Sequence, residues 1–261
     1  MVPLLESVTL LASFDGGVDA DFARGDARLF TAPSYRKQGE ARPGLGNPDV
    51  THLSSGGWRG GALQFRKKNR HAIFYKAKDN IATDGRSLAC TVSFWLNLDP
   101  DQDLAPGYCD PIQITDRSYN DSALWVDFTK DETPRHFRLG VFGDLKAWNP
   151  ENLPPAKNPT FTDRLVVVKK PPFTRGTWHQ VTMVVATPIG RAWLYLDGEL
   201  QGESRGIDEV FSWELDRATI RLGMNYVGLF DELTVFDRAL TADEVRVLYN
   251  AGQVRVRSTA L

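Results

Sequence analysis

Two carboxylate-rich segments are the first candidates for chemistry in this chain. Retaining glycoside hydrolysis needs two carboxyl groups about 5 Å apart, and a Glu-x-Asp-x-x-Glu strand supplies them because alternate side chains share one face. The nearest match runs from Glu214 through Asp216 to Thr219, where a threonine replaces the third carboxylate. The stretch 127–132 also fails the spacing. We therefore interpret Glu214 and Asp216 as a solvated turn, and favour a protein that is not an enzyme.

Other catalytic patterns are absent from the sequence. No two histidines have the spacing of a metal-binding pair, and neither a phosphate-binding glycine loop nor a nucleophile elbow is present. The four histidines are His52, His71, His136 and His179. A lyase site built from Arg, His and Tyr on separate strands leaves little trace in sequence. A polysaccharide-active hydrolase or lyase therefore stays open as an alternative.

The elements that would position such residues are mostly short strands. Segments rich in β-branched and aromatic residues, bounded by Gly, Pro, Asn or Asp, occur at 62–65, 72–75, 89–98, 122–128, 136–142, 164–168, 178–186, 192–196, 219–222 and 228–236. Asp197-Gly198 predicts a hairpin turn. Helical periodicity is confined to 241–250, with a capping box from Thr241 to Glu244 and Gly252 to end the helix.

This order of elements predicts an all-β protein, an antiparallel two-sheet sandwich or a barrel, with one short C-terminal helix. We expect a single domain over 1–261, with a core at about 9–252. Gly- and Pro-rich stretches at about 32–61 and 144–172 predict long loop insertions. In the last strand, period-two counting places Leu229, Asp231, Leu233 and Val235 on the core face.

Alternation also sorts the other strand residues. It predicts that the core contains Phe94, Leu96, Leu124, Val126, Phe137, Leu139, Val181, Met183, Leu194 and Leu196. The outward neighbours that we select as ligand-binding candidates are Trp95, Asn97, Trp125, Asp127, His136, Arg138, Trp193 and Tyr195. Aromatic rings stack on the apolar faces of sugars while polar groups fix the hydroxyls, so this set suits a glycan.

Two alternatives stay open for this outward set. The two long insertions can cover some of the aromatic side chains, or the residues can be divided between the two sheets. Weaker candidates at the rim of a site are the loop aromatics Trp58, Tyr119, Trp148 and Tyr226.

Composition excludes some classes of partner. The 31 basic and 33 acidic residues nearly cancel and are scattered, so nucleic acid is not expected. No run of eighteen apolar residues is present, so we expect no insertion into a membrane. The first fifteen residues are typical of a strand rather than a signal peptide. Cys90 alternates with core residues, whereas Cys109 lies between Pro and Gly residues in an expected loop; a disulfide between them is a minor possibility.

Five motifs occur in a recognisable order: Thr91-Val-Ser-Phe-Trp-Leu96, Gly176-Thr-Trp-His-Gln-Val181, Trp193-Leu-Tyr-Leu-Asp-Gly198, Ile220-Arg-Leu-Gly223 and Gly228-Leu-Phe-Asp-Glu-Leu-Thr-Val-Phe-Asp-Arg-Ala-Leu240. Together with Ala12-Ser-Phe-Asp-Gly16 and Gly61-Ala-Leu-Gln-Phe65, they resemble the laminin-G-like, concanavalin A-like jelly-roll domains. The resemblance implies two packed antiparallel sheets, one of them concave, and frequently a glycan, peptide or calcium site. It also suggests an extracellular or periplasmic protein.

The resemblance further implies that the first and last strands are neighbours, which would bring Asp15 and Asp231 together. Related jelly rolls often hold a structural calcium at this place, and two carboxylates with carbonyls and water are sufficient for it. The alternative is that Asp231 accepts hydrogen bonds from a neighbouring turn. We expect a non-catalytic glycan-binding or adhesion module, with structural calcium; a polysaccharide-active enzyme and a structural or protein-interaction domain are the alternatives.

Overall fold

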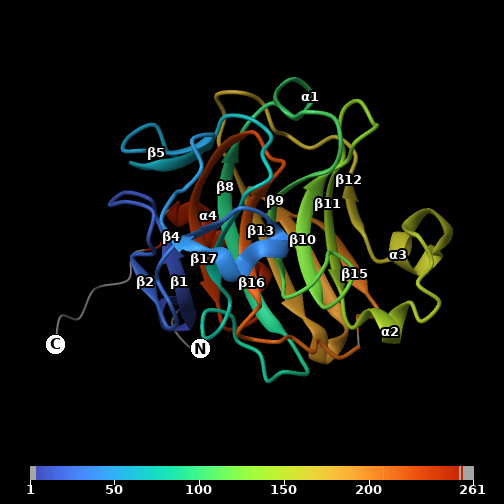
Figure 1. Ribbon diagram of the computed structural model, residues 1–261. Coiled ribbons are helices and arrows are strands. Elements are labelled where there is room, and N and C mark those ends of the chain that lie inside the picture. The colour runs from blue at the N-terminus through green and yellow to red at the C-terminus, as the bar shows by residue number, and fades with distance from the viewer. Residues whose placement is uncertain (1–3, 208, 253, 255–261) are drawn as a thin grey trace.

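The computed structural model describes residues 4–207, 209–252 and 254. These residues form two sheets, A with nine strands and B with eight, that pack as a sandwich (Figure 1). All pairs of named strands are antiparallel. The predicted antiparallel two-sheet sandwich with a helix near its C-terminal end is confirmed.

Sheet A runs in the order β15-β14-β13-β8-β17-β1-β2, and β6 followed by β5 continues it beside β17. Its strands are β1 (Val8–Ala12), β2 (Phe22–Ala23), β5 (Val50–Leu53), β6 (Ala62–Phe65), β8 (Ala89–Asn97), β13 (His179–Ala186), β14 (Arg191–Leu196), β15 (Glu199–Arg205) and β17 (Gly228–Phe236).

Sheet B runs in the order β12-β11-β10-β9-β16-β7-β3-β4. Its strands are β3 (Phe30–Ala32), β4 (Arg42–Pro43), β7 (Ala72–Lys76), β9 (Cys109–Thr115), β10 (Ala123–Phe128), β11 (Phe137–Phe142), β12 (Val166–Val168) and β16 (Thr219–Met224). The short helices are η1 (Leu4–Ser7), η2 (Tyr35–Glu40), α1 (Pro100–Asp103), α2 (Leu145–Trp148), η3 (Pro155–Lys157), α3 (Pro159–Asp163) and η4 (Thr187–Ile189).

One hydrophobic core fills the space between the sheets and joins residues from Leu10 to Val235. All ten core residues that alternation predicts lie in it. The hairpin between β14 and β15 also forms as predicted, because Asp197 and Gly198 both adopt the positive φ of a tight turn, 51° and 77°. Period-two alternation is therefore a reliable guide to which side of a strand faces this core.

Helix α4 (Ala242–Ala251) packs on the outer face of sheet A. The Thr241 hydroxyl accepts a hydrogen bond from the Glu244 N–H, the Glu244 carboxylate accepts one from the Thr241 N–H, and Gly252 ends the helix at a φ of 71°. Its buried side chains Val245 and Leu248 contact a second apolar cluster with residues of β1, β13, β14 and β17. The predicted caps are confirmed, and the helix covers the part of sheet A formed by these strands.

The predicted facing of β17 is wrong in its first half. Phe230 rather than Leu229 points into the core, where its ring stacks on Phe94 at 5.0 Å. A bulge at Asp231 and Glu232, with the latter at a φ of 52°, then shifts the phase so that Leu233 enters the core. Asp231 therefore faces away from the core, at the point where β17 exchanges β6 for β1 as its neighbour.

The two cysteines are both free and buried, so the disulfide that the sequence left open does not form. Cys109 begins strand β9 instead of lying in a loop, and its side chain joins the core. Burial raises the pKa of the Cys90 thiol to about 12 and that of Cys109 to about 11. Both thiols therefore act as small apolar groups.

Candidate functional site

The outer face of sheet B carries one row of side chains that crosses five strands. Strand register places Trp125 of β10, Gln113 of β9, Arg221 of β16, Phe74 of β7 and Phe30 of β3 in succession. These positions alternate with core residues, so their side chains leave the sheet on the side away from the core. The row connects two cavities on this face.

The first cavity has a volume of about 320 Å³ and lies over β9, β10 and β11. Its floor is the Trp125 ring, whose Nε1 donates a hydrogen bond to the Tyr119 carbonyl at 2.6 Å. The ring lies over Gly140, where a Cβ would come within 2.2 Å of it. Trp125 is only 2% exposed, whereas Tyr108 and Tyr119 at the rim are 43% and 39% exposed. The tyrosines thus offer the accessible ring surface, and Trp125 supports the floor.

A fixed pair of opposite charges lies in this cavity. The Arg138 guanidinium donates to both oxygens of Asp127, at 2.8 and 2.5 Å, and it lies between the rings of Tyr108 and Trp125. Both charged side chains are largely buried, which strengthens the interaction and holds its geometry. Such a pair presents fixed donors and acceptors to a polar ligand.

Asp110 adds a second carboxyl group to the cavity. Its Oδ2 accepts a hydrogen bond from Gln113 Nε2 at 2.9 Å. Burial, together with the negative charge of Asp127, raises the pKa of Asp110 well above its usual range. Burial also raises the pKa of Asp127, against the effect of Arg138. Of the two carboxyl groups in the cavity, Asp110 is therefore the one whose protonated form is more favoured.

The insertion 144–172 forms one wall of the first cavity. Phe161 of α3 and Trp148 of α2 pack with Trp125 and Phe142 in a small apolar cluster. Figure 1 shows α2 and α3 at one side of the sandwich, near β12. Pro155 and Phe161 line the cavity itself. A long insertion thus covers one of the predicted aromatic side chains, Trp125, as the sequence left open, and it builds part of the site.

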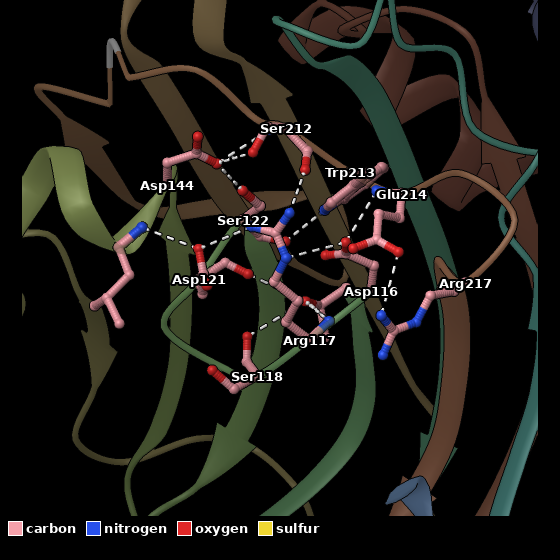
Figure 2. A network of polar contacts seen from close by, with 12 residues as sticks. Asp116, Arg117, Ser118, Asp121, Ser122, Asp144, Ser212, Trp213, Glu214 and Arg217 are labelled. Carbon is pink, nitrogen blue, oxygen red and sulfur yellow. Dashed lines mark hydrogen bonds and ion pairs between the residues drawn. The ribbon is translucent and has the colours of Figure 1, made fainter. Parts of the chain in front are cut away.

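A polar network fastens the start of this wall to the sheet (Figure 2). The Asp144 carboxylate accepts hydrogen bonds from both Ser122 and Ser212, and Asp121 accepts one from the Leu145 N–H at 3.0 Å. Burial opposes ionisation of Asp144, but these serine donors prevail and lower the pKa of that carboxyl. The hydrogen bonds to these two carboxylates therefore fix α2 at the edge of β10.

The structure divides the predicted ligand-binding residues between the two sheets. Trp125, Asp127 and Arg138 come together in the first cavity. His136 lies at the start of β11 and is not among the lining residues; its N–H bonds to Thr129 at 3.0 Å. Asn97 ends β8 of sheet A, where its Oδ1 accepts a hydrogen bond from the Gly176 N–H.

The other three predicted residues lie on sheet A and do not form an open surface. Trp95 is 3% exposed because Trp58 stacks on it at 4.1 Å and Tyr249 of α4 at 5.8 Å. Tyr195 and Trp193 belong to the cluster beneath α4. The prediction of one outward aromatic surface is thus wrong, because alternation does not report what covers a face. Of the predicted rim aromatics, only Tyr119 borders the first cavity, and Tyr226 is fully buried.

Asp15 and Asp231 lie close together, beneath the glycine-rich loop 54–61. Asp231 accepts hydrogen bonds from the N–H groups of Trp58 at 2.7 Å and Glu232 at 2.8 Å, and Asp15 accepts one from Gly61 at 3.0 Å. Burial raises the pKa of Asp231 to about 7, and Asp15 adds to the rise. The described residues contain no group of three or more His, Cys, Asp or Glu side chains placed to hold a metal ion. The hydrogen-bonded turn is present, whereas calcium stays a prediction.

Glu214 and Asp216 form the solvated turn that the sequence predicts. Both side chains are exposed, and they pair with Arg217 and Lys78 respectively. Neither lies in the first cavity.

Sequence reasoning missed Asp110, Gln113 and Tyr108 because it did not predict β9. Pro106, Gly107 and Pro111 suggested a loop, although the run from Ile112 to Thr115 alternates apolar and polar residues. That alternation was the available signal. Arg221 was also missed, because an arginine on an outward strand position is ordinarily solvated.

Known proteins show which family this fold belongs to. A sequence model of the concanavalin A-like lectin/glucanases superfamily matches residues 75–246. The chain belongs to that superfamily. The match runs from the end of β7 into α4 and includes β9, β10 and β16 of the row. The resemblance inferred from the motifs is confirmed. No curated protein matches this chain.

Solved structures with this fold include domains in complex with sugars and a domain in complex with a protein. One is domain 4 of AbnA, an extracellular GH43 arabinanase from Geobacillus stearothermophilus, solved in complex with arabinotriose. It is 18% identical to this chain with a TM-score of 0.58, and the match covers 93% of this chain and 98% of that domain. The binding domain of botulinum neurotoxin DC with rat synaptotagmin II is 12% identical with a TM-score of 0.63. The ligand-binding domain of serotype D with N-acetylneuraminic acid is 12% identical with a TM-score of 0.61.

The two toxin matches cover 96% and 95% of this chain, but this chain spans only about half of those domains, 53% and 51%. At these identities the likeness shows the fold alone. None of the helices among the described residues is long and apolar enough to span a membrane.

Proposed function

We propose that this chain is a non-catalytic carbohydrate-binding module whose site is the first cavity on the outer face of sheet B. The observation that carries the proposal is the pairing of two exposed rim rings, Tyr108 and Tyr119, with the buried Asp127–Arg138 pair. Rings that stack on a sugar and polar groups that fix its hydroxyls are the two requirements of a glycan site. The arabinotriose-bound relative supports the same class of ligand.

The size and openness of the site suit part of a longer chain. A cavity of about 320 Å³ holds roughly one or two sugar rings. The row of side chains continues from Gln113 to Arg221 and Phe74, so further rings of a polysaccharide can follow the face of the sheet. We therefore expect affinity to rise with the length of the oligosaccharide.

A glycan array, followed by calorimetry with the best ligand, tests this proposal. Replacing Tyr108 and Tyr119 together by alanine should weaken binding at least about tenfold, or about 1.4 kcal/mol. Both side chains are exposed, so the fold should be kept. Trp58→Ala is the matched control, since Trp58 is 37% exposed but lies on sheet A. If no glycan binds, with or without calcium, the structural or protein-interaction alternative replaces this proposal.

A polysaccharide-cleaving enzyme is the second candidate, and one observation favours it. Asp110 and Asp127 share the cavity, and the raised pKa of Asp110 suits a general acid. Against this, both oxygens of Asp127 are engaged by Arg138, which leaves that carboxylate poorly placed to act as a nucleophile or base. Release of reducing ends from the bound glycan, abolished by Asp110→Asn but not by Asp216→Asn, would establish the enzyme.

We further propose that calcium, as expected from the sequence, acts on stability at Asp15 and Asp231 and not on the glycan. Their closeness supports a cation, while the N–H donors around Asp231 oppose one. Melting curves at about pH 8 with calcium or a chelator test this; a rise of about 2–4 °C corresponds to about 1 kcal/mol. The rise should be absent in Asp231→Asn, and an equal melting temperature in both conditions would exclude the site.

A further inference from the structure

The second cavity on the outer face of sheet B has no role in the function proposed so far. Its volume is about 740 Å³, and it lies between η2 and strands β3, β7 and β16. It adjoins the first cavity, because Arg221 Nη1 donates a hydrogen bond to Gln113 Oε1 at 2.9 Å. A glycan that occupies the first cavity can therefore extend into the second.

Positive charge predominates in the second cavity. The cations that line it are Arg36, Lys76, Arg117, Arg217 and Arg221, and the anions are Asp116 and Asp216. Figure 2 shows that Arg117 is fully engaged: it pairs with Asp116 and Asp121 and donates to the Ser212 carbonyl. Local pairs also neutralise other members of the set, since Arg217 contacts Glu214.

The remaining side chains on this wall are similarly paired. Lys76 contacts Asp26 at 3.4 Å, and Asp216 contacts Lys78 at 2.8 Å. Two cations are left, Arg36 and Arg221, and neither makes an ion pair within the part of the chain that the structure describes. Arg36 is exposed at the rim on η2.

Arg221 is a buried cation whose contacts are all neutral. It is 3% exposed, its ring neighbour is Tyr35 at 5.5 Å, and its Nε donates to the Thr219 hydroxyl at 3.1 Å. Rotating the Gln38 amide by half a turn places its oxygen 3.1 Å from Arg221 Nη2. A guanidinium has five N–H donors, so about two remain for a ligand.

The acidic groups that face Arg221 do not balance its charge. Asp116 is shared with Arg117 and the Glu214 N–H, and burial, together with the charge of Asp127, raises the pKa of Asp110 well above its usual range. Burial without a carboxylate partner lowers the pKa of Arg221 to about 10, which still leaves it charged at neutral pH. An unbalanced buried charge is costly, and an anionic ligand would remove that cost.

We propose that Arg221, with Arg36 at the rim, forms a subsite for the carboxylate or sulfate group of an acidic sugar, so that the ligand of this face is an acidic polysaccharide. This inference rests on the proposed glycan-binding function and specifies its ligand class. The stacked rings of Phe30 and Phe74, 5.8 Å apart, follow Arg221 in the row and form the apolar part of the cavity wall beside the charge.

Three oligosaccharides of equal length test the proposal by calorimetry: one neutral, one containing uronate and one sulfated. The uronate or the sulfated ligand should bind at least about tenfold more tightly than the neutral one, and the advantage should fall as salt is added. Whichever of the two ligands shows the advantage identifies the anionic group.

Arg221→Gln should abolish this advantage, so that the uronate and sulfated ligands bind the variant no more tightly than the neutral ligand does. Arg217→Gln is the matched control, because Arg217 lines the same cavity but is already paired with Glu214. If the Arg221 variant does not fold, Arg36→Gln on the exposed turn should reduce the advantage by about threefold or more. Equal affinity for the three ligands, or an advantage that survives both substitutions, overturns the subsite and leaves the first cavity in place. Failure of all three ligands to bind overturns the proposed function itself.

Discussion

The outer faces of the two sheets carry similar residues, but those on sheet A are covered by other segments and those on sheet B border an open cavity. On sheet A, Trp95, Trp193 and Tyr195 face outwards, but α4 and the loop that carries Trp58 cover them. On sheet B, Trp125 and Arg138 face outwards and border an open cavity. An aromatic residue on an outward strand position thus belongs to a binding surface only where no later segment of the chain packs over it.

The physical difference lies in what each covering segment can bury. Helix α4 has an apolar stripe that includes Val245 and Leu248, so it gains free energy by lying flat on sheet A. The insertion over sheet B is polar and rich in proline, and only a few of its side chains, among them Trp148 and Phe161, pack on the sheet. It forms a wall and leaves the centre of the sheet uncovered.

The largest effect that we expect is on the free energy of unfolding, when a covered aromatic residue of sheet A is removed. Trp95→Ala should lower the free energy of unfolding by about 3–5 kcal/mol, because it empties a buried site between two aromatic rings. Urea unfolding measures this loss. The affinity of the folded protein for its glycan should not change. Loss of affinity without loss of stability would mean that sheet A carries the site.

Titration of the Asp231 carboxyl group should make the free energy of unfolding depend on pH. This residue lies beneath the loop that carries Trp58. Its pKa is raised to about 7 in the folded protein against about 3.9 in the unfolded chain, so the folded state binds more protons between these values. The stabilisation is complete below about pH 4 and is lost as the pH rises to about 7, by roughly 2–4 kcal/mol.

Unfolding experiments in urea at about pH 5 and pH 8 measure this difference. Asp231→Asn should remove it, because the amide does not titrate. Glu244, whose pKa is lowered to about 2 by Arg238, titrates below this window and serves as an internal reference. A wild-type stability that rises with pH over this range would contradict the assignment.

The smallest of these effects concerns the floor of the first cavity. Gly140→Ala places a Cβ within 2.2 Å of the Trp125 ring and should displace it into the cavity. We expect a loss of about 1–3 kcal/mol in stability and a glycan affinity reduced at least about fivefold. Gly16→Ala is the control, since a Cβ there has no atom within 4 Å. Unchanged affinity in Gly140→Ala would place the ligand elsewhere on sheet B.

The parts of the site that sequence predicts are those set by period-two alternation. Asp127 and Arg138 were selected as outward-facing residues on separate strands, and strand register makes them direct cross-strand neighbours. Asp110 and Gln113 were missed because Pro111 interrupts the strand pattern of β9. The facing of Phe230 was mispredicted because a bulge adds one residue and reverses the phase of alternation.

Local pattern along the chain was sufficient for most of the long strands, the Asp197-Gly198 hairpin, the caps of α4 and the ten predicted core residues, because each depends on neighbours only a few residues apart. Tertiary packing alone decided which face stays open, because α4 lies on sheet A and η2 and the 144–172 insertion lie on sheet B. It also brought Arg221 beside Gln113, 108 residues away, and left its charge without a carboxylate partner among the described residues. Contacts between segments so far apart depend on strand order and on what covers each sheet, and periodicity carries no information on either.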